Sequence, residues 1–247
     1  MNPVAFKIFG IEIMWYGILI AIGAMIAVFL GGKQAKNIEN FSEDDFYTFA
    51  IYAIIVGILG ARLYYVIFHN PEFYLSNPKE ILNIRGGGLA IHGGIIGGII
   101  VCYIYSRVKK VKFFDIFDIV SPGLVLAQGI GRWGNFINQE AHGGPTDLPW
   151  GIIVDGVKVH PTFLYESIGD IIIFLIIYFY VRKHKKFSGQ MAATYLILYS
   201  LIRFFVEGLR TDSLMLGSFR VAQIVSVIGI ITGCLIMIYG NKKNKTQ

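Results

Sequence analysis

The chain has 247 residues, of which 55% are hydrophobic and only 15% are charged, whereas soluble domains carry about 25% charged residues. Its mean hydropathy of +0.60 and the gathering of apolar residues into long blocks exclude an ordinary soluble domain and indicate a polytopic membrane protein. The net charge of +6 fits nucleic-acid binding, anionic lipid or membrane topology equally well, so the positions of the charges must decide.

Seven apolar blocks are long enough to cross a bilayer as helices, since a span needs about 20 mostly apolar residues. We therefore predict an all-α integral membrane protein with seven transmembrane helices, in a single polytopic membrane domain over residues 1–247 that retains its first block. The predicted spans run roughly over Met14–Gly31, Phe46–Phe68, Leu89–Val108, Phe114–Arg132, Thr162–Val181, Met191–Val206 and Val221–Tyr239.

Local signals support several span boundaries. Three acidic residues follow Ser42, which is the pattern of a capping box with acids at the positive end of a helix. Pro161 suits the first turn of the fifth span. The fourth span contains Asp115 and Asp118, which we expect to cap its start, and its polar residues must face protein or water and not lipid.

One long connection, over residues 137–161, joins the fourth and fifth spans. It contains Gly143-Gly144-Pro145 and Asp155-Gly156, and such glycine and proline punctuation with turn-forming acids is typical of tight turns. We therefore predict a short arm of turns or a hairpin. The glycines between Gly86 and Gly98 could suggest a phosphate loop, but close helix packing is the preferred interpretation in a membrane protein. Cys102 and Cys234 lie in apolar blocks and receive no functional role.

The lysines and arginines of the connections predict the orientation. Thirteen lie on one side of the predicted spans and six on the other, and the positive-inside rule assigns the richer set to the cytoplasm. The N-terminus and the arm over residues 137–161 are therefore expected outside, and the C-terminus inside. The richer set is Lys33, Lys36, Arg107, Lys109, Lys110, Lys112, Arg182, Lys183, Lys185, Lys186, Lys242, Lys243 and Lys245, and the other is Lys7, Lys79, Arg85, Lys158, Arg210 and Arg220.

With this orientation, polar side chains from six spans reach one depth near the outer leaflet. An arginine at mid-bilayer costs about 2.5 to 3.5 kcal/mol on insertion scales, so several such residues at one depth indicate a site. Arginines favour an anionic ligand such as phosphate, and histidine with glutamates favours proton transfer. The converging residues are Tyr16, Arg62, His92, Arg132, Asn135, Glu166, Tyr199, Arg203, Glu207 and Arg210.

Each of these residues also has a structural interpretation. Arg62 can extend its guanidinium to the outer headgroups, and Tyr16 can belong to an interfacial aromatic belt. His92 alone is more often a structural hydrogen-bonding group than a base. Glu207 and Arg210 can form an ion pair that only fixes helix packing. The convergence itself is what these interpretations leave unexplained.

The stretch from Gly131 to Gly143, Gly-Arg-Trp-Gly-Asn-Phe-Ile-Asn-Gln-Glu-Ala-His-Gly, resembles the signature of the prolipoprotein diacylglyceryl transferase family. That pattern is Gly-Arg-x-Gly/Ala-Asn-Phe-aliphatic-Asn-x-Glu-x-x-Gly, and every fixed position is filled. Other landmarks of the family follow its order along nearly the whole chain: Trp15-Tyr16-Gly17, Arg85-Gly86-Gly87-Gly88, Ile91-His92-Gly93-Gly94, His160-Pro161-Thr162-Phe163-Leu164-Tyr165-Glu166, Tyr199, Arg203-Phe204-Phe205-Val206-Glu207 and Arg210-Thr211-Asp212. The family's seven-span, N-out topology agrees with the charge distribution.

The resemblance implies the substrates, the location and the site. The donor would be phosphatidylglycerol and the acceptor the lipobox cysteine of a prolipoprotein that retains its signal peptide, in the bacterial cytoplasmic membrane with the active site toward the outer leaflet. Nucleic acid is not expected as a partner. The resemblance assigns functional positions to His92, Arg132, Asn135, Glu140, Gly143, Arg203 and Tyr16, and supporting ones to Tyr199, Glu166, Glu207 and Arg210.

The implied chemistry gives hypotheses for individual roles. Arg132 and Arg203 would stabilise the leaving phosphate, His92 would deprotonate the cysteine, and the remaining residues would bind substrate. A base built on Glu140, or activation of the thiol by the arginines alone, stays open. No metal or other cofactor is expected, because the histidines lack a compact ligand spacing. A transporter or anion channel and a non-catalytic lipid-binding factor are the rival functions.

Overall fold

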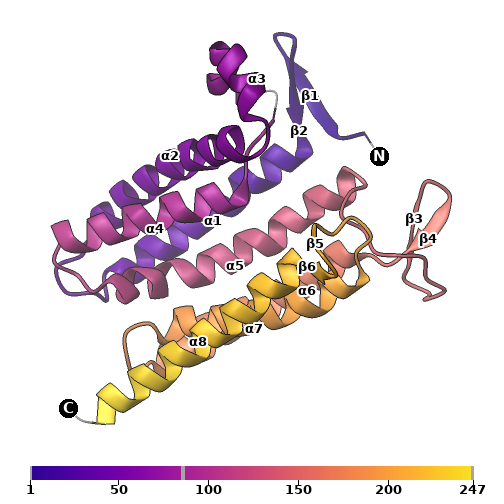
Figure 1. Ribbon diagram of the computed structural model, residues 1–247. Coiled ribbons are helices and arrows are strands. Elements are labelled where there is room, and N and C mark those ends of the chain that lie inside the picture. The colour runs from indigo at the N-terminus through magenta and orange to yellow at the C-terminus, as the bar shows by residue number, and fades with distance from the viewer. Residues whose placement is uncertain (1, 85–86, 246–247) are drawn as a thin grey trace. The chain divides into compact units, whose positions relative to one another are not determined.

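The computed structural model describes residues 2–84 and 87–245 and is mostly helical (Figure 1). Among these residues, seven helical segments are long and apolar enough to cross a membrane, and each overlaps one predicted span. They are α1 (Trp15–Ala35), α2 (Glu43–Phe68), α4 (Ile91–Val108), α5 (Phe113–Ile137), the segment Thr162–His184, α7 (Gln190–Leu209) and α8 (Val221–Lys245). The segment Thr162–His184 comprises α6 (Thr162–Leu175), the π-helix η2 (Ile176–Val181) and the 3₁₀ turn η3 (Arg182–His184).

Among the described residues the chain is not all-α as predicted, because one short antiparallel hairpin precedes α1 and two others lie between long helices. In two of them the turn residues, Phe9-Gly10 and Asp155-Gly156, have the positive φ that two-residue hairpin loops require. The third has Gly217 with φ +60° in its turn. The strand pairs are β1 (Val4–Ile8) with β2 (Ile11–Met14), β3 (Ile152–Val154) with β4 (Val157–Val159), and β5 (Met215–Leu216) with β6 (Phe219–Arg220).

The hairpin β3–β4 lies within residues 137–161, where the sequence predicted a short arm of turns or a hairpin. Two further short helices, α3 (Pro71–Ser76) and η1 (Pro78–Leu82), follow α2 and were not predicted. Arg85 and Gly86, part of one family landmark, lie outside the described residues.

The surfaces of the long helices are apolar. Between 11% and 44% of the most apolar stretch of each candidate span is buried within the protein, so most of those side chains need apolar surroundings from elsewhere. Leu59, Ile91, Phe205, Leu235 and Tyr239 are examples of large, well exposed apolar side chains. This pattern is that of helices whose outward faces contact lipid.

The contacts divide the chain into two compact units, unit 1 (Met1–Gly31 with Phe117–Gln247) and unit 2 (Gly32–Ile116). In unit 1, small residues let α1 and α5 approach closely. A Cβ at Gly23 would lie 3.0 Å from Ala127 Cα, and one at Gly123 would lie 2.7 Å from Ala27 Cα. A buried apolar core forms beside these helices from Val125, Ile173, Ile177, Val181 and Met191.

Asp118 does not cap its own helix as predicted. Its carboxylate accepts hydrogen bonds from the backbone nitrogens of Gly189 (2.8 Å) and Ala192 (2.9 Å) and pairs with Lys185 at 2.9 Å. The first N–H groups of a helix have no partner within it, so Asp118 satisfies those at the start of α7. Asp115 does lie in the first turn of α5.

In unit 2, α2 begins with the predicted capping box. Ser42 Oγ accepts from the backbone nitrogen of Asp45 and the carboxylate of Asp45 accepts from that of Ser42, both at 3.0 Å. Lys109, just after α4, pairs with Asp45 at 2.5 Å. A local signature thus fixes both the start of α2 and its contact with the end of α4.

Arg62 does not extend to lipid headgroups, because its guanidinium is buried among backbone carbonyls. It donates to Glu80 (2.5 Å), Ile81 (2.9 Å), Gly87 (2.9 Å) and Gly88 (3.0 Å). Four bonds from one planar group fasten the segment that precedes α4 to α2. The residue holds the chain leading to His92 in place.

Glycines on α2 and α4 let these helices pack closely, as the preferred interpretation of the glycine-rich stretch predicts. A Cβ at Gly60 would lie 2.5 Å from the carbonyl oxygen of Gly93, and one at Gly97 would lie 2.7 Å from that of Val56. Gly98, the next residue on α4, has no atom within 4 Å of its Cβ position.

This difference gives a stability prediction with a built-in control. Gly97→Ala is expected to lower the free energy of unfolding by about 1–3 kcal/mol, because the added methyl group must push two backbones apart. Gly98→Ala is expected to leave stability unchanged or raise it by up to about 1 kcal/mol, since alanine favours helix. Thermal unfolding of the two variants in the same detergent measures the contrast, and equal melting temperatures would contradict the packing described for α2 and α4.

Candidate active site

Two arginines and two glutamates form an ion-pair cluster where α5, α6 and α7 meet in unit 1. Glu166 bridges the arginines: one carboxylate oxygen lies 2.6 Å from Arg132 Nε and the other accepts a hydrogen bond from Arg203 Nη1. The other terminal nitrogen of Arg203, Nη2, donates to Glu207 at 2.5 Å, one helical turn further along α7. The glutamates are buried and the arginines mostly so, and the four formal charges cancel.

The helices place these side chains through spacing. Tyr199, Arg203 and Glu207 recur every four residues on α7 and therefore share one face. Tyr199 accepts a hydrogen bond from Arg132 Nη2 at 3.3 Å, and its ring stacks on Tyr195 at 5.4 Å. The tyrosine links the cluster to the apolar core beneath it.

Arg132 keeps hydrogen-bonding capacity. It uses Nε and Nη2 for Glu166 and Tyr199, while its Nη1 makes no hydrogen bond or ion pair with any residue that the structure describes. A guanidinium has five N–H groups, and a phosphate with two free oxygens fits its fork. The cluster can therefore hold an anion without first breaking its own ion pairs.

The end of α5 presents a second polar group. Asn135 Nδ2 donates to Glu140 Oε1 at 2.9 Å and Asn138 Nδ2 donates to the same oxygen at 3.3 Å. Gln139 and Ala141, on either side of Glu140, have φ of 55° and 56°. Left-handed backbone is costly for such residues, and strain of this kind gathers at functional sites. The turn fixes an exposed carboxylate beside the helix that carries Arg132.

Tyr16 lies against the same part of α5. A Cβ at the buried Gly134 would collide with the Tyr16 ring, so only a very small residue lets this ring approach the helix. Gly134 immediately precedes Asn135, which brings Tyr16 near the signature stretch. Tyr16 is also partly exposed, so its place in an interfacial aromatic belt stays compatible with a role at the site.

Gly143 joins the turn after α5 to the end of α7. It is buried, donates to the carbonyl of His160 at 2.9 Å and forms a β-bridge with Arg210. A Cβ there would lie 3.1 Å from the carbonyl oxygen of Leu209 and closer still to His160 Cβ. Any larger residue would separate these segments.

Arg210 pairs mainly with Asp212, at 2.9 Å and 2.8 Å from its Nε and Nη2, whereas Glu207 lies 3.9 Å away. This two-point hydrogen bond from Arg210 holds the pKa of Asp212 below its ordinary value, so the pair stays ionised until the pH falls well into the acid range. Arg220 donates to the backbone carbonyls of Glu207 and Arg210 and closes the end of α7. The ion pair expected between Glu207 and Arg210 is present, but each residue has a nearer partner, Arg203 for Glu207 and Asp212 for Arg210.

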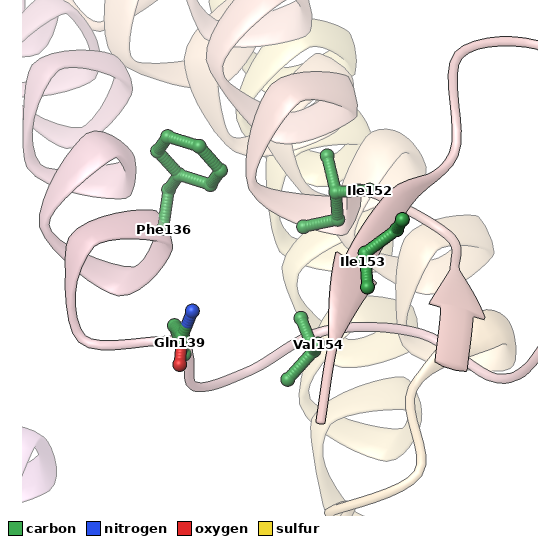
Figure 2. Close-up of a pocket in the computed structure, with 5 residues that line it drawn as sticks. All are labelled: Phe136, Gln139, Ile152, Ile153 and Val154. Atoms are coloured by element: carbon green, nitrogen blue, oxygen red, sulfur yellow. The ribbon is translucent and has the colours of Figure 1, made fainter. Parts of the chain in front are cut away.

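A shallow pocket of about 230 Å³ lies beside the end of α5. Figure 2 shows Phe136 and Gln139 on one side of it and Ile152, Ile153 and Val154 of β3 on the other. Its lining is mainly apolar. Phe136 directly follows Asn135 and Gln139 directly precedes Glu140, so the signature stretch itself contributes to the lining of the pocket.

His92 belongs to unit 2. It is exposed in the first turn of α4, and its ring centroid lies 5.7 Å from that of Tyr64. The other ten proposed site residues lie in unit 1, where Arg132, Glu166, Tyr199, Arg203 and Glu207 are in direct contact. A metal site is not formed by any group of three or more histidine, cysteine or acidic side chains within the described residues.

Sequence reasoning missed Asp170, which lies one turn after Glu166 on α6. Its side chain is completely buried, and both carboxyl oxygens are without a hydrogen-bond partner among the described residues. The i, i+4 spacing from Glu166 could have revealed it, because the two acids must share a helix face. Arg220 was also missed, since its partners are two backbone carbonyls and the hydroxyl of Ser213, which leave no sequence signal.

Comparison with known proteins gives one family for the whole chain. The sequence model described as prolipoprotein diacylglyceryl transferase matches residues 3–239. The chain is 57% identical to a protein of Clostridioides difficile (strain 630), covering 100% of this chain and 98% of the relative. It is 53% identical to one of Finegoldia magna (98% and 97%) and 52% identical to one of Clostridium novyi (100% and 98%). All three bear the name phosphatidylglycerol–prolipoprotein diacylglyceryl transferase.

Proposed function

The chain belongs to the prolipoprotein diacylglyceryl transferase family, and on that basis we propose that it transfers the diacylglyceryl group of phosphatidylglycerol to the lipobox cysteine of bacterial prolipoproteins. It is a multi-pass membrane enzyme whose products are a thioether-linked diacylglyceryl prolipoprotein and glycerol 1-phosphate. This reaction is the first step of lipoprotein maturation. The observation that carries the proposal is the full-length family match together with the buried cluster of Arg132, Glu166, Arg203 and Glu207.

The reaction is a displacement at the glyceryl carbon that bears the phosphate ester. The cysteine sulfur forms a bond to this carbon, the carbon–oxygen bond breaks, and its electron pair stays on the departing phosphate. The thiol proton passes to a base or to the phosphate. A free thiol has a pKa of about 8.5 and is mostly protonated near neutral pH, so the thiol must be activated. The negative charge that develops on the leaving phosphate must be stabilised as well.

Arg132 and Arg203 can stabilise the leaving phosphate. Charge gathers on the phosphate oxygen as the bond breaks, and preorganised charged donors stabilise it most effectively in a partly dry site. Glu166 and Glu207 fix both guanidiniums in advance, so little reorganisation is needed during the reaction. The free Nη1 of Arg132 offers the first contact to the phosphate.

The proton of the thiol has two candidate acceptors. His92 is exposed at the start of α4, and the segment before it is fastened by Arg62. Glu140 is exposed at the end of α5, held by Asn135 and Asn138. Histidine is the better match to a reaction near neutral pH. We therefore assign the role of proton acceptor to His92 and a substrate-binding role to Glu140.

We place the site toward the outer leaflet of the bacterial cytoplasmic membrane, with the N-terminus and residues 137–161 outside. The excess of lysine and arginine in the opposite connections supports this orientation.

The proposal is tested with purified protein in nanodiscs, headgroup-labelled phosphatidylglycerol and a lipobox peptide. One molecule of glycerol phosphate is expected to be released for each peptide molecule that gains the mass of a diacylglyceryl group. Both should vanish when the peptide cysteine is replaced by serine. A folded protein that binds the lipid but leaves the peptide unmodified would overturn the proposal in favour of lipid binding or transport.

A further inference from the structure

Asp170 is a buried acid that the reaction scheme above does not use. Its side chain is 0% exposed, on the face of α6 that carries Glu166. Neither oxygen has a hydrogen-bond partner among the residues the structure describes. The neighbouring helix approaches closely, since a Cβ at Gly129 would lie 3.1 Å from Asp170 Cβ. Glycine at that position of α5, one turn before Arg132, leaves the room that Asp170 occupies.

The groups that act on Asp170 come from three helices. Arg132 on α5 and Arg203 on α7 attract its charged form, and Glu166 on its own helix repels it. Tyr195 and Tyr199 on α7 also interact with it electrostatically. Each arginine is already paired with a glutamate, whose negative charge offsets part of the attraction between that arginine and an ionised Asp170.

We propose that Asp170 is a neutral carboxylic acid in the working enzyme and a positioning residue whose neutrality keeps Arg132 and Arg203 available to the phosphate of the donor lipid. A buried carboxylate without hydrogen bonds is strongly disfavoured, whereas the neutral acid can stay there. The inference rests on the proposed function for its consequence, but the protonation state itself is independent of it.

Charge counting shows why neutrality matters. Arg132 and Arg203 are balanced by Glu166 and Glu207, so the cluster has no net charge before substrate binds. A phosphodiester adds one negative charge, which the two guanidiniums can share. An ionised Asp170 would add a second negative charge inside the same buried space and compete with the phosphate for the N–H groups of the arginines. Deprotonation of Asp170 as the pH rises should therefore weaken binding of phosphatidylglycerol.

Infrared spectroscopy tests the protonation state directly. The difference spectrum between wild type and Asp170→Asn in nanodiscs at neutral pH is expected to show the carbonyl stretch of a protonated carboxylic acid. Asp155→Asn, the same change at an exposed hairpin turn, should not show this band. Carboxylate bands in the Asp170 difference spectrum would overturn the proposal.

The measurement does not depend on the variant folding. If Asp170→Asn is unstable, wild-type protein labelled with ¹³C-aspartate should show the same carbonyl band shifted to lower frequency. A labelled protein without any protonated aspartate at neutral pH would also overturn the proposal.

Kinetics test the consequence. Asp170→Asn keeps a neutral group and is expected to retain transfer within about tenfold of wild type near neutral pH. In wild type the KM for phosphatidylglycerol should rise on the alkaline side, and in Asp170→Asn this rise should be lost, which a purely structural role would not produce. Identical pH profiles for the two proteins would contradict the positioning role. Absence of transfer in wild type would refute the proposed function alone, since the infrared result would still stand.

Discussion

Replacing Arg203 by glutamine is expected to lower the rate of transfer by about 10²- to 10³-fold, the loss that follows removal of one preorganised donor from an active site. Arg203 contacts both Glu166 and Glu207, which are buried, and so links the two carboxylates. Arg132→Gln should have a similar effect. Glutamine keeps the polar character and much of the length of arginine but has neither the charge nor the planar fork.

Arg203→Lys separates the contribution of charge from that of geometry. Lysine restores the positive charge but cannot reach two carboxylates and a phosphate at once, so rescue should be partial. Arg107→Gln, at an exposed arginine in the last turn of α4, is the matched control and should keep full activity. The measurement is kcat and KM for phosphatidylglycerol with a lipobox peptide. Normal turnover in folded Arg203→Gln would refute the role assigned to the cluster.

Glu166→Gln is expected to have the second largest effect. Glu166 is buried and bridges Arg132 and Arg203, so the change removes the carboxylate that pairs with Arg132 and one of the two that pair with Arg203. Loss of one partner from a buried ion pair costs about 3–5 kcal/mol, and a cost of that size in the positioning of the arginines corresponds to at least about a 10²-fold loss of transfer. Thermal unfolding should show reduced stability as well.

A double-mutant cycle tests whether Glu166 acts through Arg203. The two glutamine substitutions should be non-additive, with a coupling of about 0.5–3 kcal/mol, because residues in one ion-pair network lose a shared interaction. Glu72→Gln, at an exposed position of α3, is the control for the loss of one glutamate charge. Strictly additive effects of Glu166→Gln and Arg203→Gln would contradict the bridging geometry.

Much of the fold could be predicted because its signals are local. Apolar blocks of sufficient length gave the seven long helical segments, and residues next to one another in the sequence gave the capping box at Ser42 and the hairpin turn at Asp155-Gly156. The hairpin β1–β2 was missed because Ile11–Met14 is apolar and merges with α1 in a hydropathy pattern. Short strands at helix ends carry too few residues to show their own periodicity.

Residues with distant partners could not be assigned correctly. Asp118 was expected to cap α5. Instead, its carboxylate accepts hydrogen bonds from backbone N–H groups at the start of α7, including that of Gly189, which is 71 residues further along the chain. For Arg62 a headgroup contact and a role in the site were both left open, yet its partners are backbone carbonyls, which have no signature in sequence. In both cases tertiary packing decides which unsatisfied backbone groups a charged side chain meets.

The sequence predicted which residues of the candidate site would converge, but not which of them would pair. Helical spacing and span direction predicted that Arg132, Glu166, Tyr199 and Arg203 lie at one height, and the structure shows that these four side chains form a connected set of contacts. Which carboxylate pairs with which arginine depends on rotamers and helix rotation, which the sequence does not encode locally. Asp170 escaped attention because a single acid in an apolar stretch has no motif around it.

The central claim is that the phosphate of phosphatidylglycerol is held by Arg132 and Arg203. The most direct test is a structure of the enzyme in nanodiscs with a phosphonate analogue of the lipid, in which a methylene group replaces the oxygen of the bond that breaks. The analogue cannot react and keeps the phosphate charge. We expect its phosphorus group within hydrogen-bonding distance of at least one of the two guanidiniums. A bound analogue whose phosphorus group lies away from both arginines would contradict the account.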